Sequence, residues 1–504
     1  MNSLPLPATL IDRPLRQVAG TALDVRPPPL CVDLDGTLLR TDTLWETAIL
    51  QWKAHPWKML LFPLWLLRGR AFLKRKLAEG VQLDCASLPF TPELLALLQR
   101  EHATGRDLVL VSACDRAVGT QVAAHVGLFR EVITSDGDTN LKGPAKARRL
   151  VERFGERGFD YAGNESADVP IWAVARERIA VNAPARLERQ LARDPAPLTR
   201  LATKRPVLRP LLRALRCHQW SKNVLVFVPL ITAHAYGNPT AVAGAVAMFV
   251  AWCLVASGIY VTNDLMDLEA DRRHPTKCRR PFASGDLPLL VGLGLGPLLL
   301  LLGCGVAAAI SPAAALAVVS YVVFSTAYSY HLKKRSLVDV FALAFLFTIR
   351  VVGGGVASGY PVTMWLLAFT SFLFLGLAFL KRCSELVRIQ ALGRRHMGSR
   401  GYGVADLAVL QTFGIASSFV AIVVFALYVN STVAEAQYAW PGALWAVAPC
   451  LLLWQCRLWL ATARAEMHDD PIVYSMRDWF SWTMGACVLA AYAVATLGRT
   501  AWAG

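Results

Sequence analysis

Four oxygen-bearing side chains follow a long uncharged run at residues 240 to 262: Asn263, Asp264, Asp267 and Asp271. The aspartates are spaced by three and four residues, which places them on one face of a helix. Crowded carboxylates repel one another, and a divalent cation that prefers hard oxygen ligands relieves this repulsion. The pattern therefore predicts a Mg²⁺ site that grips a pyrophosphate.

Basic side chains surround this acidic cluster on the same predicted side. The first group follows the acids directly and would hold phosphate oxygens: Lys277, Arg279 and Arg280. Further charged side chains lie at other span ends: the basic Lys222, Lys381 and Arg382 and the acidic Glu385. Asp339 and Arg350 interrupt the span 337 to 357, where ionisable groups are either functional or paired, and Arg350 neutralising Asp339 is one alternative. For the acidic cluster, the alternative is a solvated loop in which acids and bases pair with each other, but the spacing of the aspartates favours a functional site.

A second pair of acids lies much earlier in the chain, in Asp33-Leu-Asp35-Gly-Thr37. The apolar run Leu30-Cys31-Val32 before it predicts a buried parallel strand that opens into an active-site loop. Two acids that flank one residue at a strand end suit covalent phosphoryl transfer, in which one carboxylate attacks and the other moves the proton.

The elements that must position these residues fall into two parts. The chain has 504 residues and is 55% hydrophobic, and the apolar residues concentrate after about residue 220. We divide it into a flexible leader (1–28), an α/β domain (29–200), a linker or interfacial segment (201–221) and a membrane domain (222–504). Strands are expected at 30–34, 108–111 and around 161–163, with helices between them, which predicts an open α/β sheet. The apolar stretch from Trp57 to Leu67 is too short to span a membrane and predicts a helical cap or an interfacial helix.

Nine membrane spans are expected in the second part, at about 222–236, 240–262, 288–309, 312–331, 337–357, 362–380, 408–430, 440–460 and 479–498. Lys and Arg lie in every second connection, whereas the connections near 237–239, 310–311, 358–361 and 431–439 contain none. The N-terminus lacks the pattern of a secretory signal. Both observations predict a cytosolic α/β domain.

The bulk composition excludes other classes. The net charge of +16 sits largely beside apolar spans rather than in a solvated basic stripe, so we expect no nucleic-acid partner. The 11 cysteines show no Cys-x-x-Cys pair or regular spacing, and we expect them to be reduced and structural. A homo-oligomer is compatible with the sequence.

Asn263-Asp264-x-x-Asp267-x-x-x-Asp271 resembles the signature of the UbiA superfamily, which are nine-helix intramembrane prenyltransferases that bind Mg²⁺-pyrophosphate. Other segments most resemble the branch that transfers phosphoribose to decaprenyl phosphate. These are Arg216-x-x-Gln219-Trp220-x-Lys222-Asn223, Asp271-x-x-His274-Pro275-x-Lys277-x-x-Arg280-Pro281, Tyr328-Ser329-x-x-Leu332-Lys333 and Lys381-Arg382-x-x-Glu385-Leu386. The likeness covers about residues 205 to 498.

This resemblance implies a bacterial inner-membrane enzyme that transfers 5-phosphoribose from phosphoribosyl pyrophosphate to a polyprenyl phosphate and releases pyrophosphate. The four residues of the acidic signature would hold Mg²⁺. The sugar 5-phosphate or the lipid phosphate would be held by residues among Lys222, Asn223, Tyr328, Lys333, Arg350, Lys381, Arg382 and Glu385. The alternatives are prenyl transfer to an aromatic acid and a non-enzymatic transporter-like membrane protein.

The segment from Asp33 to Thr37 resembles motif I of the haloacid dehalogenase (HAD) superfamily, with Asp33 as nucleophile and Asp35 as general acid/base. Ser112 matches the phosphoryl-binding second motif, and Lys142 matches the lysine motif.

Gly163-Asn164-x-x-x-Asp168 resembles the metal-binding fourth motif, which usually has an acid where this chain has Asn164. The resemblance implies a phosphatase whose Mg²⁺ is held by Asp33, Asp35, Asn164 and Asp168. It would remove the 5-phosphate from the lipid product, and a regulatory or scaffolding relic is the alternative.

Overall fold

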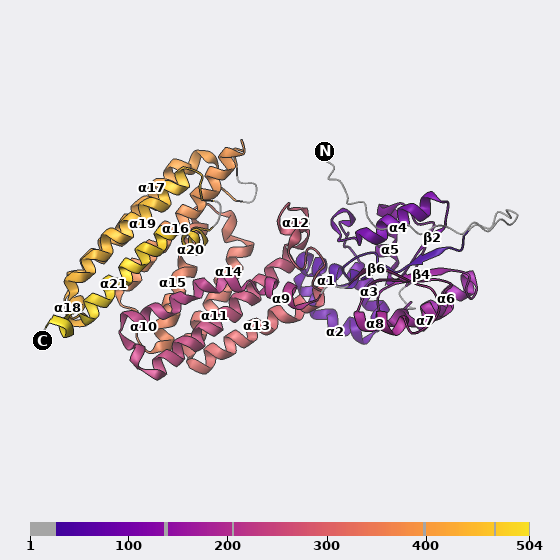
Figure 1. Cartoon of the computed structure of the whole chain (residues 1–504), viewed down its shortest axis with the longest axis horizontal. Helices are drawn as coiled ribbons and strands as arrows, with labels where there is room; N and C mark the ends of the chain where they lie inside the picture. The colour runs from indigo at the N-terminus through magenta and orange to yellow at the C-terminus, as the bar shows by residue number, and fades with distance from the viewer. Residues whose placement is uncertain (1–26, 136–139, 204–205, 397–399, 468–469, 503–504) are drawn as a thin grey trace. The chain divides into compact units, whose positions relative to one another are not determined.

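The structure is a computed structural model that describes residues 27–135, 140–203, 206–396, 400–467 and 470–502 (Figure 1). The chain separates into two compact units, residues 1–205 and 206–504. Nearly all of the leader expected at residues 1–28 lies outside the described residues.

A six-stranded parallel sheet forms the centre of the first unit, in the order β3-β2-β1-β4-β5-β6. Its strands are β1 Leu30–Val32, β2 Leu108–Asp115, β3 Glu131–Ser135, β4 Asp160–Gly163, β5 Arg178–Ala183 and β6 Leu198–Thr203. β1 is central because Cys31 pairs with both Val109 and Tyr161. The three strands expected from the sequence are β1, β2 and β4.

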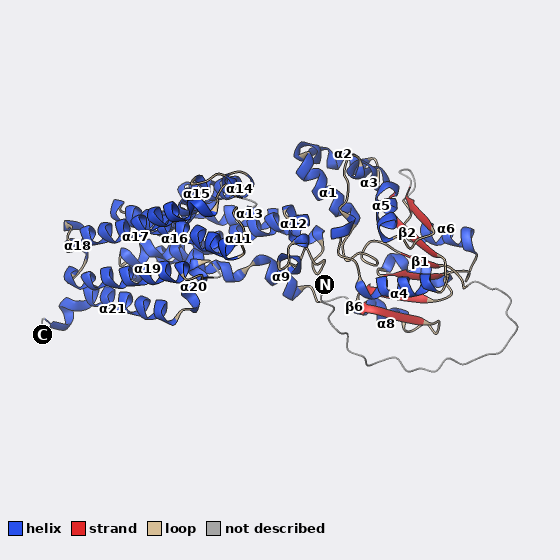
Figure 2. Ribbon diagram, turned by 90° about the horizontal axis from the view of Figure 1, so that it is seen from above, coloured by secondary structure: helices blue, strands red, loops and turns tan. Residues whose placement is uncertain are grey.

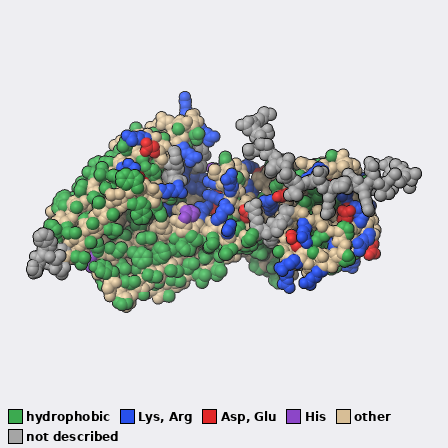
Figure 3. Space-filling view, in the orientation of Figure 1, with side chains coloured by type: hydrophobic (Ala, Val, Ile, Leu, Met, Phe, Trp, Pro, Cys, Tyr) green, Lys and Arg blue, Asp and Glu red, His purple; other side chains and the backbone are tan. Residues whose placement is uncertain are grey.

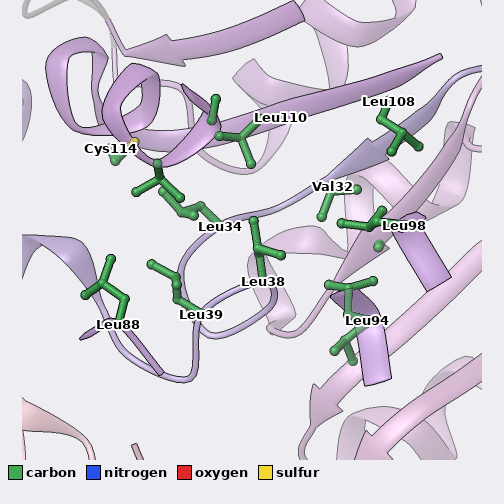
Figure 4. Close-up of a cluster of buried hydrophobic side chains, with 14 of the residues drawn as sticks. Val32, Leu34, Leu38, Leu39, Leu88, Leu94, Leu98, Leu108, Leu110 and Cys114 are labelled. Carbon is green, nitrogen blue, oxygen red and sulfur yellow. The ribbon is translucent and has the colours of Figure 1, made fainter. Parts of the chain in front are cut away.

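Helices cover both faces of this sheet: α4 Pro92–Ala103, α5 Arg116–Val126, α6 Pro144–Phe154, α7 Val169–Val174 and α8 Ala185–Leu191. Leu94 and Leu98 of α4 and Val118 of α5 join the core on one face, part of which is shown in Figure 4. Leu150 of α6 and Ile171 of α7 join the core on the other. Since both faces are covered, the central strands are apolar on both sides.

A helical cap follows β1 and consists of α1 Thr43–Ala54, the 3₁₀ segment η1 Pro56–Leu61, α2 Phe62–Leu67 and α3 Arg70–Ala78 (Figure 2). Ala48, Leu73 and Leu77 form its small core. The apolar stretch from Trp57 to Leu67 therefore lies within the cap.

The second unit is helical and its described part contains eight helices that are long and apolar enough to cross a membrane. They lie in α11 Pro239–Met266, α13 Leu289–Ile310, α14 Pro312–Tyr330, α15 Val338–Ser358, α16 Met364–Ala391, α17 Leu407–Val429, α19 Val447–Ala463 and α21 Trp479–Trp502. Shorter helices are α9 Leu208–Leu215, α12 Leu268–Arg273, α18 Thr432–Gln437 and α20 Pro471–Arg477. Hydrophobic side chains dominate the face of this unit shown in Figure 3.

Eight of the nine expected spans are helices long and apolar enough to cross a membrane, and within the described chain the first expected span does not form such a helix. Residues 222–236 lie in the 3₁₀ segment η4 Cys217–Phe227, the five-residue helix α10 Val228–Thr232 and the start of η5 Ala235–Gly237. The apolar run is shorter than the roughly 20 residues that a spanning helix needs. His234 adopts a left-handed conformation (φ 53°), which ends the short helix.

Close packing fixes the helix that carries the acidic cluster. A Cβ at Gly258 of α11 would lie 2.9 Å from the carbonyl oxygen of Gly296 in α13. A Cβ at Gly303 of α13 would lie 2.8 Å from the carbonyl oxygen of Ala251 in α11. Such small residues let membrane helices approach closely, so the end of α11 is held rigidly.

Candidate functional sites in the two units

In the first unit, the loop after β1 carries two buried or partly buried acids at the carboxyl edge of the sheet. The Asp33 carboxylate lies 2.6 Å from Nζ of Lys146 and accepts a hydrogen bond from the Thr37 hydroxyl at 3.1 Å. The Asp35 carboxylate accepts a 2.7 Å hydrogen bond from the backbone N–H of Thr43, the first residue of the cap helix α1. The cap is thereby joined directly to the reacting loop.

Burial raises the pKa of Asp33 to about 7, and the ammonium of Lys146 opposes that shift. Burial also raises the pKa of Asp35 to about 7. An ionised Asp33 can attack phosphorus, whereas a protonated Asp35 can donate to a leaving oxygen. The ammonium beside Asp33 favours its ionised form, which is the form that the predicted nucleophile needs.

The lysine against the nucleophile differs from the one the sequence indicated. Lys142 is exposed, precedes α6 and forms an ion pair with Glu165 at 2.8 Å. Lys146, one turn into α6, is buried and also donates to the Val111 carbonyl at 3.3 Å. Because α6 begins at Pro144, Lys146 rather than Lys142 lies on the face toward the sheet. The sequence signal that could have identified Lys146 is the Gly143-Pro144 pair, because it marks the start of the helix.

Asp168 and Asn164 form the rest of this site. Asp168 accepts hydrogen bonds from the Tyr161 hydroxyl at 2.8 Å and from the backbone N–H groups of Asn164 and Glu165 at 2.9 and 3.0 Å. The side-chain oxygen of Asn164 is buried without a hydrogen-bond partner within the described chain. A Cβ at Gly36 would collide with the Asn164 amide, and Gly36 has a φ of +76°. The unsatisfied amide oxygen beside the carboxylates fits a hard cation.

Ser112 lies at the same edge of the sheet, on β2, and is fully buried. Its hydroxyl accepts a 3.1 Å hydrogen bond from the backbone N–H of Cys114. Lys74 of the cap helix α3 donates to the Ala113 carbonyl at 2.6 Å. The end of β2 therefore meets the cap, and sequence reasoning did not identify Lys74.

In the second unit, the acidic cluster lies at the junction of α11 and α12. Asp264 and Asp271 are 3% and 2% exposed and share one guanidinium: Nη1 of Arg280 lies 3.1 Å from Asp264 and 2.5 Å from Asp271. Arg216, which precedes η4, lies 2.5 Å from Asp264. Two arginines thus neutralise these two carboxylates.

The other members of this cluster are more open. Asp267 caps the end of α11 and is exposed, because the helix ends at Met266 and a new helix starts at Leu268. Among the described residues, no group of three or more acid, His or Cys side chains is close enough to hold a metal ion as the side chains now stand. The carboxylate and amide oxygens are nevertheless the donor types that Mg²⁺ takes.

Asn263 donates a 3.1 Å hydrogen bond to Ser329 of α14, next to the predicted site residue Tyr328. Lys277 and Arg279 lie exposed in the 3₁₀ turn η6 Lys277–Arg279. Lys333 lies in η7 Leu332–Lys334 after α14 and is half-buried. Within the part of the chain that the structure describes, these basic side chains lie beside the helix ends and form no ion pair.

A second polar cluster brings three distant segments together. Asp470, just before α20, forms ion pairs with Lys222 of η4 at 3.3 Å and with Lys381 of α16 at 2.8 Å. Burial raises the pKa of Asp470, but Lys381 and Lys222 outweigh it and lower that pKa to about 2. Asp470 is a residue that sequence reasoning missed, because only the fold brings residue 470 next to residue 222.

Arg350 lies deep in α15 and is held by neutral partners. Its Nε donates to the Asn223 side-chain oxygen at 2.9 Å, and its Nη2 donates to the Tyr321 hydroxyl at 2.8 Å. Lys222 and Arg350 both approach the ring of Phe347, at 5.8 and 5.6 Å. The alternative in which Arg350 neutralises Asp339 is therefore wrong.

Asp339 instead pairs with Arg382 of α16 at 2.7 Å, and both side chains are fully buried. Arg382 also pairs with Glu385, and Tyr402 donates a hydrogen bond to Asp339. Arg382 and Glu385, predicted to bind substrate, are thus engaged in a network that ties α15 to α16.

The fold and these clusters define a multi-pass membrane protein with a hydrolase-like unit ahead of its helices. A family model described as the UbiA prenyltransferase family matches residues 224–479, and one described as haloacid dehalogenase-like hydrolase matches residues 30–172. The uncharacterized protein y4nM of Sinorhizobium fredii is 35% identical over 472 residues, which cover 93% of this chain and 91% of that protein. The chain belongs to the UbiA prenyltransferase family and carries an N-terminal HAD-like hydrolase domain.

Two further likenesses concern the helical unit. The decaprenyl-phosphate phosphoribosyltransferase of Corynebacterium glutamicum is 35% identical over 190 residues, which cover 37% of this chain and 57% of that protein. The chain thus matches little more than half the length of that transferase. A solved UbiA homolog from Archaeoglobus fulgidus, bound to GPP and Mg²⁺, is 15% identical with a TM-score of 0.44, covering 56% of this chain and 97% of that one.

Proposed function

We propose that the helical unit transfers 5-phosphoribose from phosphoribosyl pyrophosphate to a polyprenyl phosphate and releases pyrophosphate. The observation that carries this proposal is the presence of two separate polar clusters. In one, Arg216 and Arg280 pair with Asp264, and in the other, Lys222 and Lys381 pair with Asp470. The Arg216 guanidinium of the first cluster lies 4.9 Å from the centre of the Tyr260 ring. A donor with a pyrophosphate at one end and a phosphate at the other suits such an arrangement.

The acidic cluster would bind the pyrophosphate end. Asn263, Asp264, Asp267 and Asp271 would hold Mg²⁺, which neutralises charge on the departing pyrophosphate. Once these carboxylates take the cation, Arg216 and Arg280 become available to phosphate oxygens, together with Lys277 and Arg279. Bond cleavage at the ribose C1 leaves the electron pair on the pyrophosphate, and an oxygen of the acceptor phosphate forms the new bond.

The second cluster would bind a phosphate on the other side of the reacting carbon. Lys222 and Lys381 supply two ammonium groups, and a phosphate takes the place that Asp470 now occupies. Arg350 lies behind them without an acidic partner among its described contacts. This arrangement keeps positive charge for a phosphate in a region where charge is expensive.

The HAD domain would then remove the 5-phosphate. A carboxylate oxygen of Asp33 attacks phosphorus, the bond from phosphorus to the 5-oxygen breaks, and Asp35 gives its proton to that oxygen. Water next attacks the aspartyl phosphate and returns a proton to Asp35. The products are the ribosyl lipid and inorganic phosphate, and Lys146 balances the charge on Asp33 throughout.

The competing reaction in this family is prenyl transfer to an aromatic acid. Protein in nanodiscs would receive labelled phosphoribosyl pyrophosphate with polyprenyl phosphate, or labelled prenyl pyrophosphate with 4-hydroxybenzoate. We expect label in lipid only from the first pair, and loss of that product in Asp264→Ala. Label from the second pair alone would replace our proposal with prenyl transfer, and no product from either pair, together with ion flux that survives Asp264→Ala, would favour a transporter.

The phosphatase step has its own test, the mass of the lipid product. The parent should yield the ribosyl lipid, whereas Asp33→Asn should accumulate its 5-phosphate. Identical phosphorylated products from both proteins would reject the coupling of the two reactions while leaving the transferase in place.

We also propose that the HAD domain and the basic connections face the cytosol of a bacterial inner membrane. This orientation requires the segment from η4 to η5 to cross the bilayer, although it is not one continuous helix. Lys222 at its start pairs with Asp470, and the Ile231 carbonyl near its end accepts a hydrogen bond from Tyr492 of α21. Lys333 and Lys334 follow α14, and Lys381 lies near the end of α16, whereas residues 431–439 between α17 and α19 contain no Lys or Arg. This distribution follows the positive-inside rule.

A further inference from the structure

The cap of the HAD domain has an unusually apolar outer face, formed by η1 and α2. Trp57, Leu60, Leu64 and Leu67 are 61%, 81%, 58% and 84% exposed. Large apolar side chains gathered in one short segment mark an interaction site on a soluble surface. The neighbouring Leu66 is also exposed, so the face is continuous.

The opposite face of the same segment is packed and fixes the orientation. Phe62 and Trp65 contact the small core of Ala48, Leu73 and Leu77. The rings of Trp45 and Phe62 stack with centroids 6.3 Å apart. The inner face of the segment is therefore packed against the cap core, and the exposed leucines lie on its outer face.

The charge around this face indicates its partner. Lys58, Arg68 and Arg70 lie within or beside η1 and α2, and residues 52–78 contain neither Asp nor Glu. Of the other bases in this range, Lys74 donates to the Ala113 carbonyl, and Arg75 and Lys76 pair with Glu79. The Lys58 ammonium lies 5.7 Å from the centre of the Trp57 ring. A short helical segment with leucines and tryptophan on one side and basic residues around it is typical of a segment that lies in a bilayer interface. Basic residues near an anionic surface add electrostatic attraction to that surface.

We propose that the outer face of η1 and α2 inserts into the headgroup region of an anionic bilayer. Two features of the chain favour lipid over another protein. Strand β6 ends at Thr203 and the helical unit begins with α9 at Leu208, so the connection reaches no more than about 17 Å. The membrane helices thus keep the cap at a high effective concentration near lipid. The 12 apolar-rich residues of Pro56–Leu67 are too few to span it.

Docking of the cap has a consequence for the substrate of the HAD domain. The cap contacts the reacting loops at two points, through Thr43 to Asp35 and through Lys74 to the Ala113 carbonyl. A cap held in the interface places these loops beside phosphomonoesters borne by lipids. The substrate class is then an amphiphilic phosphomonoester; this step rests on the proposed phosphatase function, whereas the docking itself does not.

Photocrosslinking of the full chain in nanodiscs tests the docking. A benzophenone amino acid would replace Leu60, Leu64 or Leu67, with Gln99 on the exposed face of α4 as the matched control. We expect phospholipid adducts by mass spectrometry at the three cap positions, at least fivefold above Gln99, and a several-fold loss in neutral lipid or high salt. Crosslinks to protein only, lipid adducts equal to those at Gln99, or no adducts would overturn the proposal.

The triple variant Leu60→Ser, Leu64→Ser, Leu67→Ser tests the substrate class and leaves Phe62 and Trp65 in place. It should hydrolyse the phosphoribosyl lipid about tenfold more slowly than the parent, with an unchanged rate on p-nitrophenyl phosphate. Equal rates on the lipid would overturn the substrate class. If the parent hydrolyses neither compound, the phosphatase function and this substrate class both fail, while the crosslinking result still decides the docking.

Discussion

At the scale of single residues, the site of the HAD domain is defined by which side chain reaches the nucleophile. Lys146 is buried against Asp33, whereas Lys142 is exposed and pairs with Glu165. Lys146 also touches the Tyr161 hydroxyl, which in turn donates to Asp168. One buried ammonium therefore connects the first and fourth motifs of the domain.

We predict that Lys146→Met lowers phosphate release by about 100-fold or more, because the charge on Asp33 and on the bound phosphate loses its partner. Lys142→Met is the matched control and should stay within about twofold of the parent. Release of inorganic phosphate from p-nitrophenyl phosphate measures both. A larger loss for Lys142→Met than for Lys146→Met would assign the lysine motif to Lys142 after all.

Lys222 gives a prediction for pH. Burial lowers the pKa of Lys222 to about 8, although Asp470 opposes the shift. The ammonium is charged below that pH and is lost above it, so transfer should fall as pH rises through about 8. In Lys222→Arg the guanidinium stays charged, and the decline should move to higher pH. An alkaline decline that is identical in both proteins would show that another group titrates.

At the scale of elements, the cluster around Asp470 depends on segments from opposite ends of the helical unit. η4 carries Lys222, and the connection between α19 and α20 carries Asp470. The Trp220 indole donates a 3.0 Å hydrogen bond to Ser257 of α11, which anchors η4 beside the helix that bears Asp264. A short polar segment in place of a ninth long span is therefore what brings Lys222 to the site.

Arg382 gives a prediction about stability at this scale. Arg382→Met leaves Asp339 buried without its 2.7 Å partner, and loss of one member of a buried pair destabilises by about 3–5 kcal/mol. The paired change Asp339→Leu with Arg382→Met should recover a large part of that loss. Thermal unfolding in detergent, followed by size-exclusion chromatography, measures both. A single variant as stable as the parent would show that the α15–α16 network is dispensable.

At the scale of the whole molecule, one chain joins a hydrolase-like unit to a membrane transferase unit. Each has its own core, and the buried clusters of the sheet unit contain only residues of that unit. Under the proposed function, a covalent connection between the units would keep the product of one close to the other.

Topology gives the prediction at this scale. Single reporter cysteines in a cysteine-free background should be labelled from the cytosolic side at Lys334 and from the opposite side at Glu435 in α18. The positive-inside distribution is the reason for this orientation. Labelling of both positions from one side would contradict the order of the spans between them, and the reverse pattern would place the HAD domain outside the cytosol.

The sequence by itself determined the division into two units, the motifs of each and the class of chemistry, because these depend on local composition and on spacing along one strand or helix. Asp33 and Asp35, for example, are brought to one loop by three consecutive residues. Only the tertiary structure decided which distant side chains meet: Lys146 against Asp33, Arg280 between Asp264 and Asp271, and Asp470 between Lys222 and Lys381. Such pairings depend on helix starts and on the packing of elements up to 248 residues apart, and neither is written in the spacing of a motif.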